Sequence, residues 1–144
     1  MAERLSLQFR RLLEERKPQR IQPNNDIIAK EIVSSEYDLG KSKNSFEGKD
    51  YKWAIIQAYY SIFHAARALI YSKGYREKSH RACLVALKEV FLDSLGEERI
   101  KDLEEAMDLR KSADYGSAYT DEDARNLVGK AEDFLENAKR ILKT

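Results

Sequence analysis

The sequence of 144 residues has little of what disulfide-rich, zinc-binding and β-rich proteins need. Its one cysteine, Cys83, excludes an internal disulfide and any zinc site built from several cysteines. Six glycines and two prolines are too few for the many tight turns of a β-sandwich or barrel. The two histidines, His64 and His80, lie far apart and form no HExxH motif, and no GxxxxGK[ST] or GxGxxG loop is present. We therefore expect no bound metal and no cofactor.

The chain also lacks an excess of charge of one sign. Its 26 basic and 25 acidic side chains leave a formal net charge of +1, so no field over the whole molecule indicates a nucleic-acid-binding protein. One short segment differs, because YSKGYREKSHR, residues 71–81, has a single acid among four basic residues: Lys73, Arg76, Lys78 and Arg81. Basic residues interleaved with tyrosines and a histidine suit a phosphate backbone and unpaired bases, although a solvated turn is the simpler explanation.

No long uncharged hydrophobic run is present. The most apolar stretch, residues 53–71, is interrupted by Gln57, His64 and Arg67, which makes it a poor membrane-spanning helix. The first 17 residues contain no apolar segment of the kind that a signal peptide needs. We expect a soluble, cytoplasmic protein with no membrane segment.

What the sequence does contain is helical periodicity. Apolar residues recur at helical spacing, and the segments end near prolines and glycines. The predicted helices cover residues 2–17, 26–46, 49–73, 80–93, 97–115 and 121–143. Asn25 or Asp26 is the expected cap of the second helix, and no segment favours a strand. The fold class is all-α, an up-and-down bundle of five to six helices over residues 25–144, preceded by an extra helix and a proline-containing connector, residues 1–24.

The third predicted helix, residues 49–73, is apolar on nearly every side, which is typical of a helix at the centre of a bundle or at an interface. One side is more polar, with residues spaced by four and three positions: Trp53, Gln57, Tyr60, His64, Arg67 and Tyr71. This polar stripe is either a solvated groove or interface, or a set of amphipathic side chains with buried stems and satisfied polar ends.

The end of the fifth predicted helix, LRKSADYG, residues 109–116, is the second candidate site. Arg110 continues the apolar stripe of that helix, and Asp114 lies four residues later on the same face. An arginine oriented by an aspartate, with the hydroxyl of Tyr115 nearby, is suited to bind an anion or phosphate. A structural Arg–Asp pair that closes the end of the bundle is the alternative.

Three segments together resemble the HEPN family, the "higher eukaryotes and prokaryotes nucleotide-binding" domain: AYYSIFHAARALIYSKG at 58–74, KSH at 78–80 and LRKSADYG at 109–116. The resemblance covers roughly residues 27–143. It implies a helical bundle that forms a homodimer and associates with a nucleotide or RNA. It also implies a minimal nucleotidyltransferase as partner, in a two-component or toxin–antitoxin-like system.

Many HEPN proteins are metal-independent ribonucleases, with an arginine followed after four to six residues by a histidine. Arg110 matches that arginine, but Tyr115 occupies the histidine position, and a phenol with a pKa of about 10 is a poor base at neutral pH. We therefore expect binding without catalysis. The alternatives are a ribonuclease toxin that pairs Arg110 with His80 or His64, and a non-catalytic structural subunit. The expected ligand-binding residues are Arg110, Asp114, Tyr115, Tyr60, His80, Arg76, Lys78 and Arg81.

Overall fold

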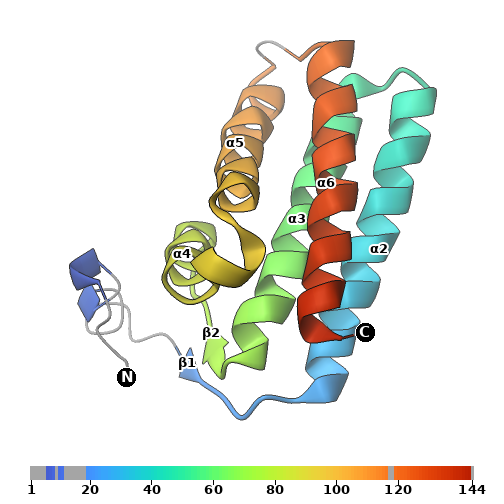
Figure 1. Ribbon diagram of the computed structural model, residues 1–144. Helices are drawn as coiled ribbons and strands as arrows, with labels where there is room; N and C mark the ends of the chain where they lie inside the picture. Colours follow the sequence, from blue (N-terminus) through green and yellow to red (C-terminus); the bar gives the residue numbers. More distant parts are fainter. Residues whose placement is uncertain (1–5, 9, 12–18, 117–118, 144) are drawn as a thin grey trace.

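The computed structural model describes residues 6–8, 10–11, 19–116 and 119–143, with the backbone alone at residue 19. Within these ranges, five long helices form an up-and-down bundle (Figure 1). They are α2 (Asn25–Glu47), α3 (Tyr51–Ser72), α4 (His80–Leu95), α5 (Glu97–Asp114) and α6 (Asp121–Leu142). The predicted all-α fold is confirmed. Most of the helix predicted over residues 2–17 lies outside the described residues; residues 7–8 and 10–11 are helical.

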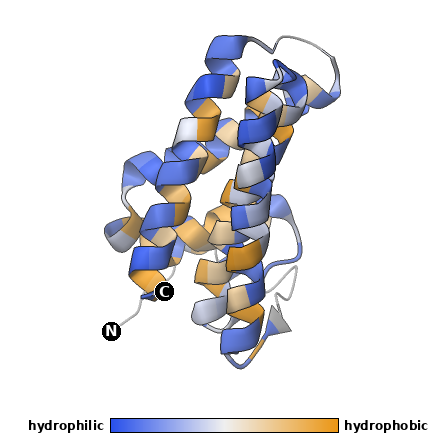
Figure 2. Cartoon of the chain, turned by 90° about the vertical axis from the view of Figure 1, so that its right-hand side faces the viewer, coloured by the Kyte–Doolittle hydropathy of each residue, from blue (hydrophilic) through white to orange (hydrophobic). Residues whose placement is uncertain are grey.

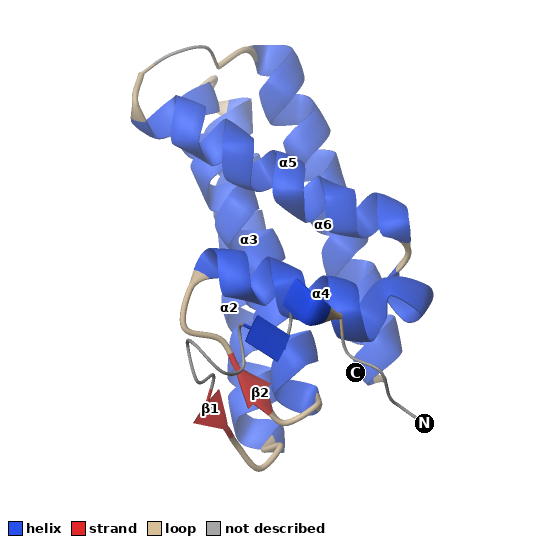
Figure 3. Cartoon of the chain, turned by 90° about the vertical axis from the view of Figure 1, so that its left-hand side faces the viewer, coloured by secondary structure: helices blue, strands red, loops and turns tan. Residues whose placement is uncertain are grey.

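Helix α3 occupies the centre of the bundle. Helices α2, α5 and α6 run alongside it, and the shorter α4 lies across the bundle near the end of α3 (Figures 1 and 3). Hydrophilic residues cover the outward sides of the helices, and hydrophobic residues lie between them (Figure 2). Fourteen residues of α3 are buried, Ile55, Ile62 and Leu69 completely. The apolar circumference of α3 is thus covered by the other helices of the same chain.

Small residues allow α2 and α3 to lie close together. Ser35 and Ser61 are fully buried, and each hydroxyl donates to the other residue's carbonyl oxygen, at 2.7 Å and 2.9 Å. Ser42 on α2 likewise donates to the carbonyl oxygen of Ala54, at 2.7 Å. These bonds satisfy polar groups that burial would otherwise penalise.

The cap of α2 is Asn24, one residue before the predicted Asn25 or Asp26. Asn24 has extended backbone angles, and its side-chain oxygen accepts hydrogen bonds from the backbone N–H groups of Asp26 and Ile27. Asn25 is already helical, so it cannot serve as the cap. The hydroxyls of Ser79 and Thr120 cap α4 and α6 by accepting hydrogen bonds from the backbone N–H groups of Ala82 and Asp123.

A short antiparallel ribbon joins the connector to the turn after α3, where no strand was expected. Strand β1 (Gln19–Arg20) pairs with β2 (Tyr75–Arg76), and the N–H of Ile21 donates to the carbonyl oxygen of Gly74 at 3.0 Å. Gly74 has φ +85°, and a Cβ there would lie 3.1 Å from the Ile21 carbonyl oxygen, so glycine is required at this position. Two-residue strands carry no periodic pattern, which is why the sequence does not reveal them.

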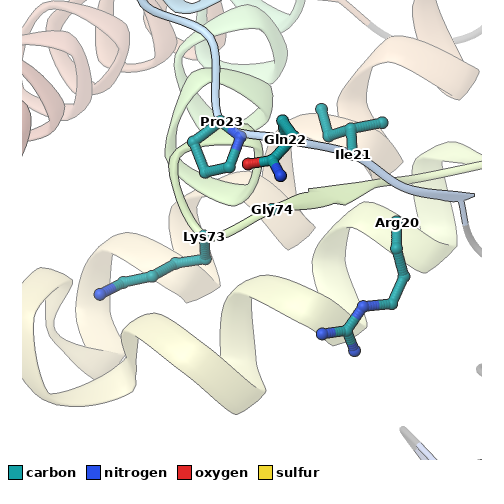
Figure 4. Close-up of a pocket in the computed structure, with 6 residues that line it drawn as sticks. All are labelled: Arg20, Ile21, Gln22, Pro23, Lys73 and Gly74. Carbon is teal, nitrogen blue, oxygen red and sulfur yellow. The ribbon is translucent and has the colours of Figure 1, made fainter.

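The ribbon brings a fifth basic residue, Arg20, to residues 71–81, which we call the basic turn. The guanidinium of Arg20 lies over the ring of Tyr75, 5.2 Å from its centroid. Residues 20–23 pass over Lys73 and Gly74 and leave a shallow pocket between them (Figure 4). The side chains of Arg20 and Lys73 extend in different directions from this pocket, so they do not converge on one point (Figure 4).

Candidate functional site

One side of α3 is only partly covered by the rest of the described chain. Between residues 54 and 71, every residue of α3 is buried except Gln57, Tyr60, His64 and Arg67. These four lie on the predicted polar stripe; Trp53, at its start, is half exposed, and Tyr71, at its end, is buried. The solvent-facing side of the central helix is therefore the polar one.

An aromatic and cationic cluster lies along this side, where α3, α4 and α5 meet. The Cζ of Arg110 lies 5.7 Å and 5.6 Å from the ring centroids of Tyr59 and Tyr60. The imidazole of His80, the first residue of α4, packs 4.0 Å from Phe63 and edge-on to Tyr60, 6.3 Å between centroids. Three predicted site residues, Tyr60, His80 and Arg110, thus come together from three helices. Together with Tyr59 and Phe63 they form what we call the Arg110 cluster: Tyr59, Tyr60, Phe63, His80 and Arg110.

The guanidinium of Arg110 is only partly used by the protein. Its Nε lies 2.9 Å from Oδ2 of Asp114, one turn later on α5, as the spacing predicts. This Nε is shut off from solvent but is not aligned for a hydrogen bond. Among the described residues, none accepts a hydrogen bond from the two terminal amino groups. Because the side chain is about one-third exposed (32%), these amino groups can reach a ligand.

His80 is held in place by a buried tyrosine. The hydroxyl of Tyr59, a side chain 1% exposed, forms a hydrogen bond with Nδ1 of His80. Burial lowers the pKa of His80, and the positive charges of Arg110, Arg67 and His64 lower it further. Burial also raises the pKa of the Tyr59 hydroxyl, against the opposing effect of Arg110. Tyr59 is therefore protonated, and His80 is neutral, at neutral pH.

His64, the other histidine, faces away from this arrangement toward two acids of α2. Its Nδ1 lies 2.7 Å from Oε1 of Glu31, and its Nε2 lies 3.6 Å from Oδ2 of Asp38. Burial raises the pKa of Asp38, while His64 acts in the opposite direction. Both ring nitrogens thus have acidic neighbours, which the spacing of His64 on α3 alone could not show.

Arg67, also on the polar stripe, forms an ion pair with Glu77 of the basic turn. Its Nε lies 3.1 Å from Oε2 of Glu77 and also donates to the hydroxyl of Tyr71 at 3.1 Å. The side chain of Glu77 is 9% exposed, and its other oxygen is buried without a hydrogen-bond partner. Burial raises the pKa of Glu77, although Arg67 lowers it. The polar ends of His64 and Arg67 are therefore paired within the chain.

The remaining predicted residues lie at the surface. Arg76, Lys78 and Arg81 are exposed on and after the basic turn that leads to His80. Tyr115, at the end of α5, is 85% exposed, and its ring packs against no other ring in the described part of the chain. The structure does not bring Tyr115 to the Arg110 cluster, and its role stays a prediction.

Two residues of the cluster were not anticipated. Tyr59 and Phe63 have the pattern of core residues, and both are indeed buried. Only the pair Tyr59-Tyr60 in the sequence hinted that one ring would face inward and the next outward.

The described ranges contain neither a cluster of metal-binding side chains nor a helix that could span a membrane. No group of three or more His, Cys, Asp or Glu side chains is placed there to hold a metal ion. None of the helices in those ranges combines the length and apolar character needed to cross a bilayer.

Comparison with known proteins shows to which family the chain belongs. The HEPN domain profile matches residues 31–142, which include α3, α4 and α5 with the whole Arg110 cluster. "Putative toxin MJ0605" of Methanocaldococcus jannaschii is 33% identical over 115 residues, 78% of this chain and 86% of the relative. "Putative toxin MJ0142" of the same organism is 29% identical over 119 residues, 80% of this chain and 81% of that protein. A "UPF0332 protein" of Archaeoglobus fulgidus is 30% identical over 120 residues, 81% of this chain and 96% of that protein. The chain belongs to the HEPN domain family.

Proposed function

We propose that this protein is a toxin-like HEPN protein that binds the phosphate of a nucleotide or RNA at the Arg110 cluster. One observation carries the proposal: the guanidinium of Arg110 pairs with Asp114 only through Nε, and its terminal amino groups form no hydrogen bond with the described residues. A planar fork of donors above two tyrosine rings, beside a neutral histidine, suits a phosphate attached to a base. The two relatives named as toxins support the biological setting.

The surroundings of the cluster favour an anionic ligand. Asp114 holds one side of the guanidinium and leaves the other side open. The half-buried ring of Tyr60 offers a face for a base, and base–aromatic stacking contributes about 1–3 kcal/mol per base. The basic turn adds further positive charge for a longer RNA, through exposed side chains: Arg20, Lys73, Arg76, Lys78 and Arg81.

The proposed assembly is a homodimer that acts with a partner nucleotidyltransferase. Support for the homodimer comes from the partly exposed polar side of α3 and from three exposed large apolar residues: Val33 and Tyr37 on α2, and Trp53 on α3. The nucleotidyltransferase is an expectation from the family resemblance alone.

The homodimer is testable by multi-angle light scattering at micromolar concentration. We expect twice the mass of the chain, 16.7 kDa, because an interface that includes the α3 stripe can bury more than about 1,200 Å² in total. Trp53→Glu should shift the species toward monomer, whereas Lys101→Glu, on an exposed part of α5, should not. A wild-type monomer would count directly against this part of the proposal.

A ribonuclease is the second candidate function. One observation favours it: Arg110 and His80 both contact the rings of Tyr59 and Tyr60. An arginine and a histidine are therefore close together although position 115 is not a histidine. In that case His80 would have to accept a proton from the attacking hydroxyl.

Binding and cleavage can be measured with one labelled RNA. We expect the fluorescence anisotropy of a single-stranded 12-mer to rise with protein at low salt, and its affinity to fall as salt is added, because phosphate contacts release counterions. The same RNA, incubated in EDTA and run on a gel, should remain intact. Absence of binding to both the 12-mer and AMP would refute the proposed function, and Arg110-dependent cleavage would establish the ribonuclease instead.

A further inference from the structure

We propose that Tyr59 is a positioning residue that fixes His80 in the tautomer with the proton on Nε2, so that His80 offers a hydrogen-bond donor to the bound phosphate. The part of this inference that concerns the ligand rests on the proposed function. The part that concerns the tautomer does not, because it follows from the hydrogen bonds within the protein.

The hydrogen bond between Tyr59 and His80 could in principle run in either direction. If Nδ1 of His80 donated to the hydroxyl, the O–H of Tyr59 would need another acceptor, and none is present among the described residues. Tyr59 is 1% exposed, so its hydroxyl has almost no access to solvent water as that acceptor. If instead Tyr59 donates, its only proton is bonded and Nδ1 acts as the acceptor. Hydrogen-bond accounting therefore assigns the donor to Tyr59.

The tautomer follows from this direction. A neutral imidazole carries one proton, and a ring whose Nδ1 accepts a hydrogen bond carries that proton on Nε2. The raised pKa of Tyr59 keeps its hydroxyl protonated, and the lowered pKa of His80 keeps the ring neutral. The rings of Tyr59 and Tyr60 from α3 contact the ring of His80, and the charges that act on its pKa are those of Arg110 from α5 and of Arg67 and His64 from α3. None of them is a carboxylate that would stabilise an imidazolium.

Packing holds the donor in a fixed orientation. The ring centroid of Tyr59 lies 6.1 Å from that of Phe63, stacked, and 5.0 Å from that of Tyr60, edge-on, so the ring and its hydroxyl oxygen are held in place. The ring of His80 in turn packs 4.0 Å from Phe63. Because His80 is half-buried, its Nε2–H has access to solvent on the side not occupied by Tyr59.

With His80 in this tautomer, the groups that the site offers to a ligand are hydrogen-bond donors. Arg110 provides its two terminal amino groups and His80 provides Nε2–H, all beside the ring of Tyr60. A ligand that only accepts hydrogen bonds, such as the phosphate of a nucleotide or of an RNA backbone, matches this set. A general base at the same place would need a lone pair on Nε2, which this tautomer lacks. The inference thus favours phosphate binding over cleavage by His80.

The tautomer can be read directly by long-range ¹H–¹⁵N correlation spectra of the uniformly labelled, ligand-free protein at pH 7. The chain has two histidines, so a His64→Gln variant leaves the signals of His80 alone. We expect Nδ1 at the shift of an unprotonated nitrogen and Nε2 at that of a protonated one. Tyr59→Phe should give averaged shifts from mixed tautomers, whereas Tyr60→Phe, which removes the neighbouring hydroxyl, should leave the pattern unchanged. A wild-type spectrum with the proton on Nδ1, or with mixed tautomers, would overturn the inference even if Tyr59→Phe does not fold.

A titration with AMP then tests the ligand part. We expect AMP to shift the Nε2 signal of His80, and Tyr59→Phe to weaken AMP binding by about fivefold, as for the loss of one oriented hydrogen bond. AMP binding that leaves Nε2 unperturbed would overturn the donor role. No binding of AMP or RNA, with the tautomer as expected, would refute the proposed function while the positioning role of Tyr59 stands.

Discussion

Arg110→Ala is expected to weaken RNA binding by roughly tenfold to a hundredfold and to leave the protein folded. A charge-assisted hydrogen bond contributes about 1.5–3 kcal/mol, and the terminal amino groups of Arg110 can form such bonds with phosphate. The free energy of unfolding should fall by less than about 1 kcal/mol, because the pair with Asp114 is about one-third exposed on both sides. Anisotropy titrations and thermal melts of the same preparations measure both quantities.

A matched control is available on the same helix. Arg99 is also about one-third exposed and pairs with an aspartate, Asp133, at 2.9 Å, but it makes no contact with the tyrosine pair. Arg99→Ala should therefore bind RNA like the wild type. The slope of log affinity against log salt should decrease by about one phosphate contact in Arg110→Ala alone. If Arg110→Ala and Asp114→Ala both lowered the melting temperature strongly while the folded fraction still bound RNA, Arg110 would be a structural clasp.

Arg67→Ala is expected to destabilise the protein by about 3–5 kcal/mol at pH 7. Arg67 is the main partner of Glu77, whose side chain is 9% exposed, so the substitution leaves a buried carboxylate without a compensating charge. Chemical unfolding followed by circular dichroism at 222 nm measures the loss. The double variant Arg67→Met/Glu77→Leu removes both charges and should recover most of the stability.

The dependence on pH identifies the cause of this loss. Burial already raises the pKa of Glu77 above its ordinary value of about 4.5, and removal of Arg67 should raise it further. An acid with a higher pKa in the folded state binds more protons there, so stability decreases as pH rises through the window between the two pKa values. The deficit of Arg67→Ala relative to wild type should therefore be smaller at pH 5 than at pH 7. An equal deficit at both pH values would mean that lost packing, and not Glu77, is responsible.

The helices could be predicted from sequence because each one has a buried stripe, and four of the five, all but α5, begin at a polar cap. Leu127, Ala131, Phe134 and Ala138 of α6, for example, recur at helical spacing, and all four are buried. The ribbon of β1 and β2 could not be predicted, because its bonds join segments about 55 residues apart and depend on the shape of one glycine turn.

Several residues of the candidate site could be predicted from the sequence, but the contacts between them could not. The residues Tyr60, His80 and Arg110 each stand out in the sequence, but only packing of α4 and α5 against α3 places them around one pair of rings. The partners of the two histidines were not predictable, since Tyr59 has the sequence pattern of a core residue and Glu31 that of a solvated one. Long-range pairs of this kind leave no periodic signal.

The ribbon also bonds residues 19–21 to the segment that leads to His80. The turn from Gly74 to His80 is bonded to Ile21 through a backbone hydrogen bond, and a side chain at Gly74 would be strained by the positive φ and close to the Ile21 carbonyl oxygen. Displacement of the connector would therefore strain the turn that supplies His80 and the basic residues. By thermodynamic reciprocity, a molecule that grips the connector and a phosphate bound beside His80 would alter each other's affinity by the same factor.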